Sequence, residues 1–338
     1  MRALRCNAYG PLEQLVVEDV PDPEPGPGDA VVDVHAAAVN FPDVLLVQDK
    51  YQISAPVPFT PGSEFAGIVR AIGADVRDLR PGDRVCGTGL MGAFAEQIAM
   101  PAASLTPVPE EIDLRDAAAF GVVYFTAYHT LRSVAEVQPG EWVAVLGAAG
   151  GVGLASVEIA KLFGARVVAA ASSDDKLAVC TDRGADAVIN YDTEDLKTRL
   201  KELTDGGADV VVDPVGGPYA EQALRSTRFG GRFVTVGFAS GEIPRIPLNL
   251  VLLKGMSIMG FEFLSFSQRA PELARRDREE LLALFAAGRI RPHISSSYPL
   301  AEGAAAMLEV AERRATGKVL VVPGGEGRPS PHAPPGAT

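Results

Sequence analysis

The sequence predicts an α/β protein of two domains, one β-rich and barrel-like and the other a doubly wound parallel sheet covered by helices. Its 338 residues exceed the length at which a single hydrophobic core usually keeps growing. Turn-forming residues punctuate the first third of the chain, whereas apolar strands later alternate with helical stretches. Near the middle, one apolar strand runs directly into a glycine-rich turn, which is typical of a dinucleotide site.

Composition narrows the possible partners and the compartment. The formal net charge of -12 argues against nucleic acid or an anionic membrane as a partner. Cys6, Cys86 and Cys180 stand far apart, which suits a reducing compartment and offers neither a disulfide framework nor a thiolate metal cage. No signal-like start and no apolar run of about 18 residues occurs. We therefore expect a cytoplasmic protein that is neither secreted nor inserted in a membrane.

Residues 1–124 are expected to form the β-rich domain. Turn clusters at 21–29 and 81–83 separate short strand-like runs. The clearest of these runs are 30–34 and 67–72. This spacing of turns and strands favours a barrel-like domain.

Residues 125–260 are expected to form the parallel-sheet domain. Continuous apolar strands separated by helices indicate a parallel sheet that is covered on both faces. The predicted strands are 142–146, 166–171, 187–189, 210–212, 232–236 and 257–260.

The last part of the chain changes character again. Residues 261–323 contain an amphipathic helix around 278–287 and a final strand at 319–322, and we expect them to rejoin the first domain. Residues 324–338 have little apolar surface to bury, so they are expected to form a disordered tail.

The glycine turn after strand 142–146 is expected to hold the pyrophosphate of a dinucleotide. Helix 154–163 and strand 166–171 follow it and complete a βαβ unit of about 30 residues. Unpaired N–H groups and the helix dipole favour an anion at the start of such a helix. An ordinary βα turn also favours glycine, so the motif alone leaves that alternative open. The predicted contact residues are Ala149, Gly150, Gly151, Val152 and Gly153.

Residues after the second strand of this unit indicate the cofactor. An NAD site usually has an acidic residue about 20 positions past the glycines, whereas this chain has Ser172 and Ser173 there. Hydroxyl groups can donate to a 2′-phosphate and Lys176 adds a positive charge, so NADPH is predicted. Asp174 and Asp175 would repel that phosphate, but we expect them to cap the helix that begins near Lys176. Lys176 could instead be an ordinary surface lysine.

Several short sequence motifs follow one another in the order in which they occur in a known protein family. They are Asn40-Phe41-Pro42-Asp43, Pro61-Gly62-Ser63-Glu64-Phe65-Ala66-Gly67, Arg80-Pro81-Gly82-Asp83-Arg84-Val85, Ala148-Ala149-Gly150-Gly151-Val152-Gly153, Gly184-Ala185-Asp186 with Asn190-Tyr191, and Gly230-Gly231-Arg232. The chain thereby resembles the quinone oxidoreductase branch of the medium-chain dehydrogenase/reductase family, up to Pro323. The resemblance implies a GroES-like catalytic domain, a Rossmann domain with the cofactor in the cleft between them, and a homodimer joined at Rossmann sheet edges.

The same resemblance assigns cofactor residues. Ser173, Lys176 and Tyr191 would hold the adenosine phosphate, although Tyr191 could equally be a packed tyrosine. Other expected contacts open the second domain or follow its strands. These are Tyr124, Thr126, Gly216, Gly237 and Phe238.

The resemblance also bears on metal binding. Zinc-dependent relatives hold a catalytic metal on cysteine and histidine, and the matching positions here are Asn40, Ser63 and Val122. No cysteine or histidine occurs between Cys86 and His129, so no zinc site with proper ligands can be assembled. We therefore predict no metal and disfavour alcohol oxidation through a proton relay.

The expected chemistry is hydride transfer from nicotinamide C4 to a quinone or an α,β-unsaturated carbonyl compound. Negative charge develops on the acceptor oxygen, and the Asn40 amide or the Tyr51 hydroxyl could donate a hydrogen bond to it. Asp43 is expected to orient its neighbours, and Asn40 taken alone could be a simple turn residue. The sequence thus predicts an NADPH:quinone oxidoreductase-like enzyme. An enoyl or acrylyl thioester (CoA) reductase and a non-catalytic NADPH-binding protein are the alternatives.

Overall fold

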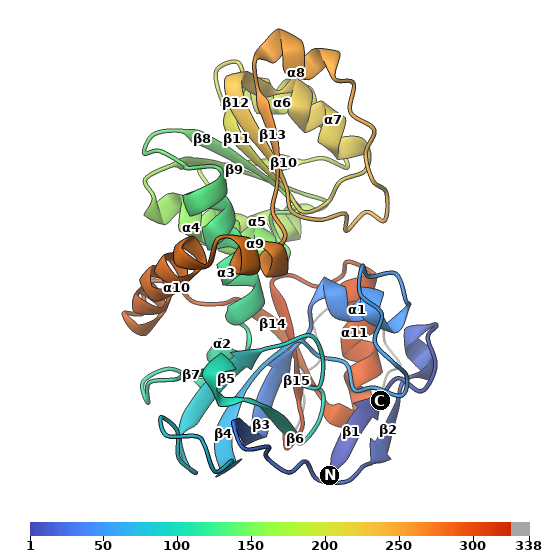
Figure 1. Cartoon of the computed structure of the whole chain (residues 1–338). Helices are drawn as coiled ribbons and strands as arrows, with labels where there is room; N and C mark the ends of the chain where they lie inside the picture. The colour runs from blue at the N-terminus through green and yellow to red at the C-terminus, as the bar shows by residue number, and fades with distance from the viewer. Residues whose placement is uncertain (326–338) are drawn as a thin grey trace. The chain divides into compact units, whose positions relative to one another are not determined.

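The chain folds into two compact units, shown in Figure 1, and the computed structural model describes residues 1–325. Among the described residues, the first unit comprises Met1–Val122 together with 292–325, and the second comprises Val123–Arg291. Residues 326–338, most of the expected tail, lie outside the described residues. Within residues 1–325, no helix is both long and apolar enough to cross a membrane.

A mostly antiparallel sheet, seven-stranded within residues 1–325, forms the centre of the first unit. Its long strands β3 (Asp29–Ala38) and β4 (Glu64–Ile72) pair antiparallel, with Ala38 opposite Glu64. Alternate side chains of β3 enter the hydrophobic core, because successive residues of a strand point to opposite faces. The other elements are β1 (Arg2–Arg5), β2 (Val16–Asp19), α1 (Phe41–Val47), β5 (Arg84–Thr88), β6 (Gln97–Pro101), β7 (Leu105–Pro107), α2 (Leu114–Ala118), β14 (Ile294–Pro299), α11 (Gly303–Ala311) and β15 (Lys318–Val322).

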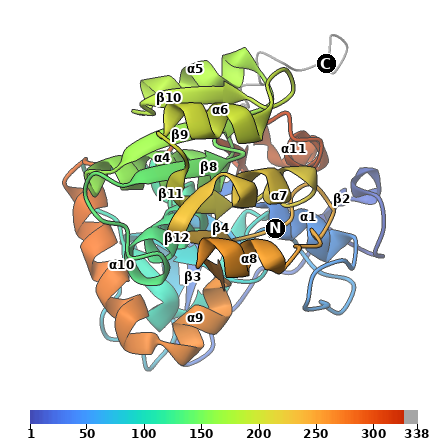
Figure 2. The ribbon, with the colours of Figure 1, turned by 90° about the horizontal axis from the view of Figure 1, so that it is seen from above.

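A parallel sheet, six-stranded within residues 1–325, forms the second unit in the order β10-β9-β8-β11-β12-β13. Figure 1 shows α4 and α5 on one face and α6, α7 and α8 on the other, and Figure 2 shows α6 beside α7. Both faces are therefore buried, which explains why the strands are continuous apolar runs. The elements are β8 (Trp142–Leu146), α4 (Gly151–Leu162), β9 (Arg166–Ala171), α5 (Asp174–Asp182), β10 (Ala187–Asn190), α6 (Leu196–Leu203), β11 (Ala208–Asp213), α7 (Pro218–Arg225), β12 (Thr227–Thr235), α8 (Asn249–Lys254) and β13 (Ser257–Gly260). The predicted α/β fold class with a doubly wound parallel sheet is confirmed.

Two helices belong to the second unit and not to the first, where we expected residues 261–323 to return. They are α9 (Phe263–Arg269) and α10 (Pro271–Ala286). The chain rejoins the first unit only at Pro292. The expected boundary at residue 124, by contrast, lies close to the observed division after Val122.

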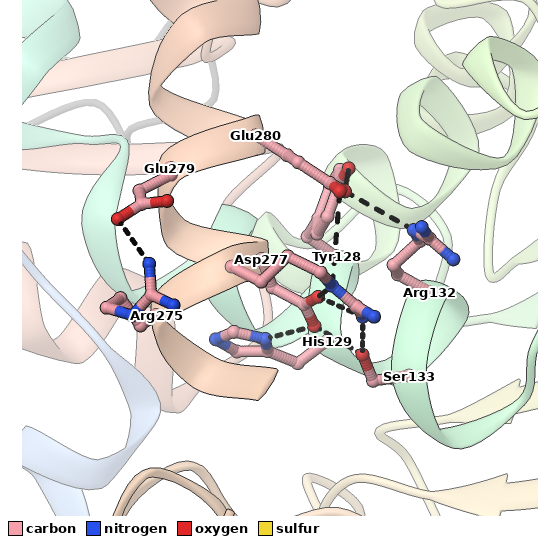
Figure 3. A network of polar contacts seen from close by, with 9 residues as sticks. Tyr128, His129, Arg132, Ser133, Arg275, Asp277, Glu279 and Glu280 are labelled. Carbon is pink, nitrogen blue, oxygen red and sulfur yellow. Dashed lines mark hydrogen bonds and ion pairs between the residues drawn. The ribbon is translucent and has the colours of Figure 1, made fainter. Parts of the chain in front are cut away.

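Hydrogen bonds and ion pairs join α10 to residues 128–133 of the second unit, as Figure 3 shows. The Asp277 carboxylate lies 2.8 Å from His129 Nδ1, and its other donors include the Ser133 hydroxyl at 2.6 Å. One turn later, the Tyr128 hydroxyl donates to Glu280 over 2.7 Å. Burial alone would raise the pKa of Asp277, but hydrogen bonds from His129, Ser133 and Arg276 lower it overall. Asp277 is therefore a buried, ionised acceptor.

Removing this carboxylate should destabilise the second unit. Asp277→Ala is expected to lower the free energy of unfolding by about 3 kcal/mol, because its buried donors would lose their acceptor. Glu279→Ala is the matched control, since Glu279 lies on the same helix in an exposed ion pair with Arg275 and should change stability little. Urea unfolding followed by circular dichroism measures both; equal losses would contradict the anchoring role.

Candidate functional site

A buried polar cluster lies where three neighbouring strands of the first unit meet. Asn40 follows β3, Glu64 begins β4 and Lys318 begins β15, and β3 pairs with both other strands. Lys318 Nζ lies 2.7 Å from Glu64 Oε1, 2.7 Å from Asn40 Oδ1 and 3.1 Å from the Val39 carbonyl oxygen. Asn40 Nδ2 donates to Glu64 Oε1 at 2.9 Å and to Ser63 Oγ at 3.1 Å. The Asn40, Glu64 and Lys318 side chains are almost completely buried.

The second oxygen of Glu64 reaches the start of α3 (Gly121–His129). Glu64 Oε2 accepts the backbone N–H of Val122 at 2.8 Å. A carboxylate is favourable there, because it meets an N–H group without a partner in its own helix and the positive end of the helix dipole. A Cβ at Gly121 would stand 2.6 Å from Thr88 Cγ2 and 3.2 Å from Glu64 Oε2, so glycine is needed for this approach.

Asp43 is held against Asn40 in the first turn of α1. The Asn40 N–H donates to Asp43 Oδ2 at 2.8 Å, and the Asp43 N–H donates to the Asn40 carbonyl at 3.0 Å. Burial raises the pKa of Asp43 to about 7, and the Asn40 N–H and the nearby Ser63 hydroxyl act against that rise. The structure thus brings together two of the three predicted catalytic residues, Asn40 and Asp43.

Tyr51, the third predicted catalytic residue, lies in the loop after α1. Its side chain is partly buried and packs against the hydrophobic core of the first unit. Asn40 is more constrained, since both hydrogens of its amide point to Glu64 and Ser63. The catalytic role of Tyr51 therefore stays a prediction.

The glycine turn follows β8 as predicted, but α4 begins earlier than expected. Its first residue is Gly151, and the preceding Gly150 provides no side-chain cap. The first-turn N–H groups of α4 can therefore hold an anion. A Cβ at Gly153 would stand 2.3 Å from the Gly147 carbonyl oxygen, so this glycine does allow close packing of helix on strand. A Cβ at Gly150 would meet that oxygen only at 3.4 Å.

The loops after β8 and β11 touch at the point where the strand order reverses. A Cβ at Gly147 would stand 2.7 Å from Val215 Cγ2. The buried Asp213 carboxylate shapes the second loop, because its Oδ1 accepts the N–H groups of Val215 and Gly216 at 2.8 Å. Dinucleotides bind at this kind of position in open parallel sheets.

The predicted contacts after β12 reach the same loop. The Phe238 ring packs on Gly216, where a Cβ would lie 2.9 Å from Phe238 Cδ1. The Gly237 N–H donates to the carbonyl of Asp213 at 3.4 Å. The ends of β11 and β12 thus bring three predicted residues, Gly216, Gly237 and Phe238, close together.

We expected Asp174 and Asp175 to cap the helix after β9, but the structure differs. The cap of α5 is Ser173, whose hydroxyl accepts the Lys176 N–H at 3.4 Å, and Asp174 and Asp175 form the first helical turn. Either residue type can cap a helix, and the chain here turns one residue earlier. Asp174 accepts a hydrogen bond from Asn190 Nδ2 at 2.8 Å.

The residues predicted to bind the 2′-phosphate gather at the ends of β9 and β10. Lys176 Nζ lies 3.2 Å from Ser172 Oγ, so the hydroxyl and the ammonium are neighbours. Tyr191 follows β10, and its ring centroid lies 4.2 Å from that of Tyr219. Tyr191 thus packs against another tyrosine, and its contact with a cofactor stays a prediction.

Tyr124 and Thr126 lie on α3 and are buried within the second unit. The Tyr124 hydroxyl donates to Glu158 Oε2 at 2.5 Å. Their predicted contact with the nicotinamide therefore also stays a prediction.

Sequence reasoning missed Glu64 and Lys318. Lys318 begins the otherwise apolar strand Lys318–Val322, all of which is buried. A lysine at the start of such a strand could have been recognised as needing a buried partner. Glu64 similarly stands between Ser63 and the apolar residues of β4.

Comparisons with known proteins agree with this architecture. Residues 26–110 match the family model "Alcohol dehydrogenase GroES-like domain", and residues 151–280 match "Zinc-binding dehydrogenase". The "Quinone oxidoreductase-like protein 2 homolog" of Nematostella vectensis is 40% identical over 325 residues, covering 95% of this chain and 88% of that protein.

Solved structures agree as well. The crystal structure of Escherichia coli quinone oxidoreductase complexed with NADPH has a TM-score of 0.88 and 28% identity, covering 96% of this chain and 100% of that one. The CurF ER cyclopropanase of the curacin A biosynthetic pathway has a TM-score of 0.85 and 26% identity, covering 95% of this chain and 98% of that one. One fold thus supports different reactions, and the identity of the acceptor depends on the residues of the site.

These matches define the class, an oxidoreductase that joins a GroES-like domain to a nicotinamide-cofactor domain. The chain belongs to the quinone oxidoreductase branch of the medium-chain dehydrogenase/reductase superfamily.

The donor set of the buried cluster does not fit zinc, which one matched family model names. Asn40 and Ser63 offer an amide and a hydroxyl, and Val122 contributes only its backbone N–H to the cluster. Zinc in proteins takes cysteine sulfur, histidine nitrogen or carboxylate oxygen, and Lys318 already pairs with the Glu64 carboxylate. Within residues 1–325, no group of three or more His, Cys, Asp or Glu could hold a metal ion.

The raised pKa of Asp43 predicts a pH-dependent stability. Between the ordinary value of 3.8 and about 7, the folded state keeps a proton that the unfolded state releases. The stabilisation from this proton is therefore complete at low pH and is lost as pH rises through the folded-state pKa. Relative to Asp43→Asn, the wild-type free energy of unfolding should fall by up to about 1.4 kcal/mol per pH unit across that window. Urea unfolding of both proteins measures this, and a constant difference would contradict it.

Proposed function

We propose that this protein is an NADPH-dependent reductase that transfers hydride to quinones or α,β-unsaturated carbonyl compounds without a metal. The proposal rests mainly on the contact between Ser172 and Lys176 at the end of β9. An NAD site would usually have a carboxylate there. A hydroxyl beside an ammonium instead suits a 2′-phosphate, because both groups can donate hydrogen bonds to it.

The second unit supplies the groups for holding the cofactor. Bound NADPH would supply the hydride. The first turn of α4 orients the pyrophosphate with its N–H groups, while Lys176 and Ser172 bind the 2′-phosphate. The hydrogen bond from Asn190 engages the carboxylate of Asp174. This reduces the repulsion that Asp174 would exert on the phosphate.

The first unit supplies the group that acts on the acceptor. We assign the donor role to the Tyr51 hydroxyl, which can donate a hydrogen bond to a substrate oxygen, and a positioning role to the Asn40 amide, which donates to Glu64 and Ser63. A hydrogen bond to the acceptor oxygen stabilises the negative charge that develops there as hydride arrives. Asn40 and Asp43 orient the start of α1, from which the chain leads to Tyr51.

Alternative acceptors are less well supported. A CoA thioester would need a basic surface for the phosphates of the coenzyme. Arg275 is paired with Glu272 and Glu279, and Arg276 with the buried Asp277. These ion pairs leave the two arginines poorly suited to bind such a ligand.

Removal of the Tyr51 hydroxyl should slow the chemical step. Tyr51→Phe is expected to lower kcat by about 100-fold, a loss typical of a missing oxyanion donor, and to leave NADPH affinity unchanged. Tyr9→Phe is the matched control, because Tyr9 packs against the same core. Steady-state kinetics and cofactor titration measure the two quantities; an unchanged kcat would remove Tyr51 from the mechanism.

Removal of the Lys176 ammonium should change cofactor preference. Lys176→Ala is expected to weaken NADPH binding about 10–100-fold, the worth of a charge-assisted hydrogen bond, with little effect on NADH. Lys197→Ala on the exposed side of α6 is the control. Fluorescence titration with each nucleotide measures the affinities. An equal loss for both nucleotides would make Lys176 an ordinary surface lysine.

We also propose a homodimer that forms at the edge of the six-stranded sheet. β13 is one of the two edge strands of this sheet, and its neighbours carry exposed apolar side chains, namely Phe229 on β12, 79% exposed, and Leu252 on α8, 81% exposed. Unpaired strand edges and exposed apolar surface both favour association. Sedimentation velocity should show a wild-type dimer and a folded monomeric Leu252→Glu variant. A monomeric wild type would contradict the proposal.

The function itself is tested by following NADPH absorbance against quinones, simple enones and enoyl-CoA esters, with NADH and with added chelator. Chelator-insensitive oxidation of NADPH by quinones or enones is the expected result. Turnover confined to CoA esters would indicate a thioester reductase. Tight NADPH binding without turnover would indicate a non-catalytic protein.

A further inference from the structure

Lys318 is a lysine whose ammonium is wholly surrounded by protein. Only 3% of its side chain and 1% of that of Glu64 are exposed. Each of its three N–H groups has an acceptor within 3.1 Å, namely the Val39 carbonyl, Asn40 Oδ1 and Glu64 Oε1. Lysine is rarely buried in this way, because removing an ammonium from water is costly unless every donor is satisfied.

The backbone conformation of Gly317 allows the next residue, Lys318, to reach the buried cluster. Gly317 adopts a φ of +72°, and a Cβ at this position would stand 2.2 Å from the His293 carbonyl oxygen. That oxygen accepts the Lys318 N–H at 2.8 Å. The turn that delivers Lys318 to the cluster therefore needs glycine at position 317.

Stability alone is a poor reason for such a pair. Replacing a buried ion pair by apolar residues of similar volume is often neutral or stabilising, since the desolvation of two charges offsets their attraction. A buried pair can instead fix the conformation of the groups around it. The geometry of Asn40 shows what is fixed here.

The pair determines how the Asn40 amide is turned. A lysine ammonium can only donate and a carboxylate can only accept, so Lys318 must face the amide oxygen and Glu64 must face the amide nitrogen. The structure has this arrangement, at 2.7 Å and 2.9 Å. Asn40 in turn holds Asp43 through its backbone N–H at 2.8 Å. Either charge alone still requires this orientation of the amide, so only the replacement of both charged groups by neutral ones would leave the amide free to rotate by half a turn.

We propose that Lys318 is a positioning residue for the reduction: its ammonium, paired with Glu64, fixes the Asn40 amide and with it the first turn of α1 that leads to Tyr51. The cluster of Asn40, Ser63 and Glu64, which does not suit zinc, thus contains a cation of the protein itself, the Lys318 ammonium. This inference rests on the proposed reductase function. It predicts that Lys318 acts on turnover through Asn40 and leaves cofactor affinity unaffected.

A double-mutant cycle tests the coupling to Asn40. Lys318→Met should lower kcat at least tenfold and leave the Kd for NADPH within twofold of the wild type. If Lys318 acts through Asn40, the Lys318→Met/Asn40→Ala double variant should be no slower than Asn40→Ala alone. Multiplied losses in the double variant would overturn the proposal. Lys197→Met, on an exposed surface of the second unit, is the matched control and should keep wild-type kinetics.

A second variant separates positioning from folding. Lys318→Met leaves the Glu64 carboxylate unpaired, whereas Lys318→Met/Glu64→Gln removes both charges and should recover the lost resistance to urea. We expect kcat to stay at least tenfold below the wild type in this balanced variant. Recovery of kcat together with stability would make Lys318 merely structural and overturn the proposal.

Crystal structures separate the positioning role of Lys318 from the reductase function. Absence of turnover in the wild type on every acceptor would refute the reductase function itself. Crystal structures of the wild type and of the charge-balanced variant would then decide the positioning role, since Asn40 Oδ1 should lose its place beside residue 318. An unchanged Asn40 amide in the variant would overturn the inference independently of any assay.

Discussion

The first unit depends on one constraint, the need to satisfy a positive and a negative charge away from water. Lys318 and Glu64 meet at 2.7 Å, and neither side chain can move outward without leaving the other alone in a medium of low polarity. This requirement ties together the starts of β4 and β15, the end of β3 and, through Val122, the first turn of α3. Separate parts of the chain are thereby held in one register by a few hydrogen bonds.

Periodicity and glycine placement were sufficient to predict the parallel sheet of the second unit. The strand at 142–146 agrees residue for residue with β8, and Gly153 packs against Gly147 as its place in the motif implied. Both features arise from local rules, because apolar runs report burial on both faces and glycine reports close backbone approach. Features decided by neighbours in sequence are accessible to such reasoning.

Features that depend on contacts between residues far apart in the sequence could not be predicted from local patterns. The amphipathic pattern near residues 278–287 indicates that one face of α10 is buried, but long-range contacts such as that of Asp277 with His129 show on which unit it packs. Lys318 likewise finds Glu64 across 254 positions of sequence. The prediction of the α5 cap was wrong for a different reason, since Ser173 and Asp174 are both good capping residues and a shift of one residue decides between them.

The split of the first unit across the chain has a consequence for biosynthesis. Val123–Arg291 is continuous and can become compact as soon as it has left the ribosome, because all its sheet partners are then available. The first unit must wait, since Asn40 is 278 residues away from the lysine that completes its surroundings. Until then the end of β3 at Ala37 and Ala38 lacks its partner strand β15, and the polar cluster lacks its cation. The second unit can therefore complete its sheet before the first unit has all of its strands.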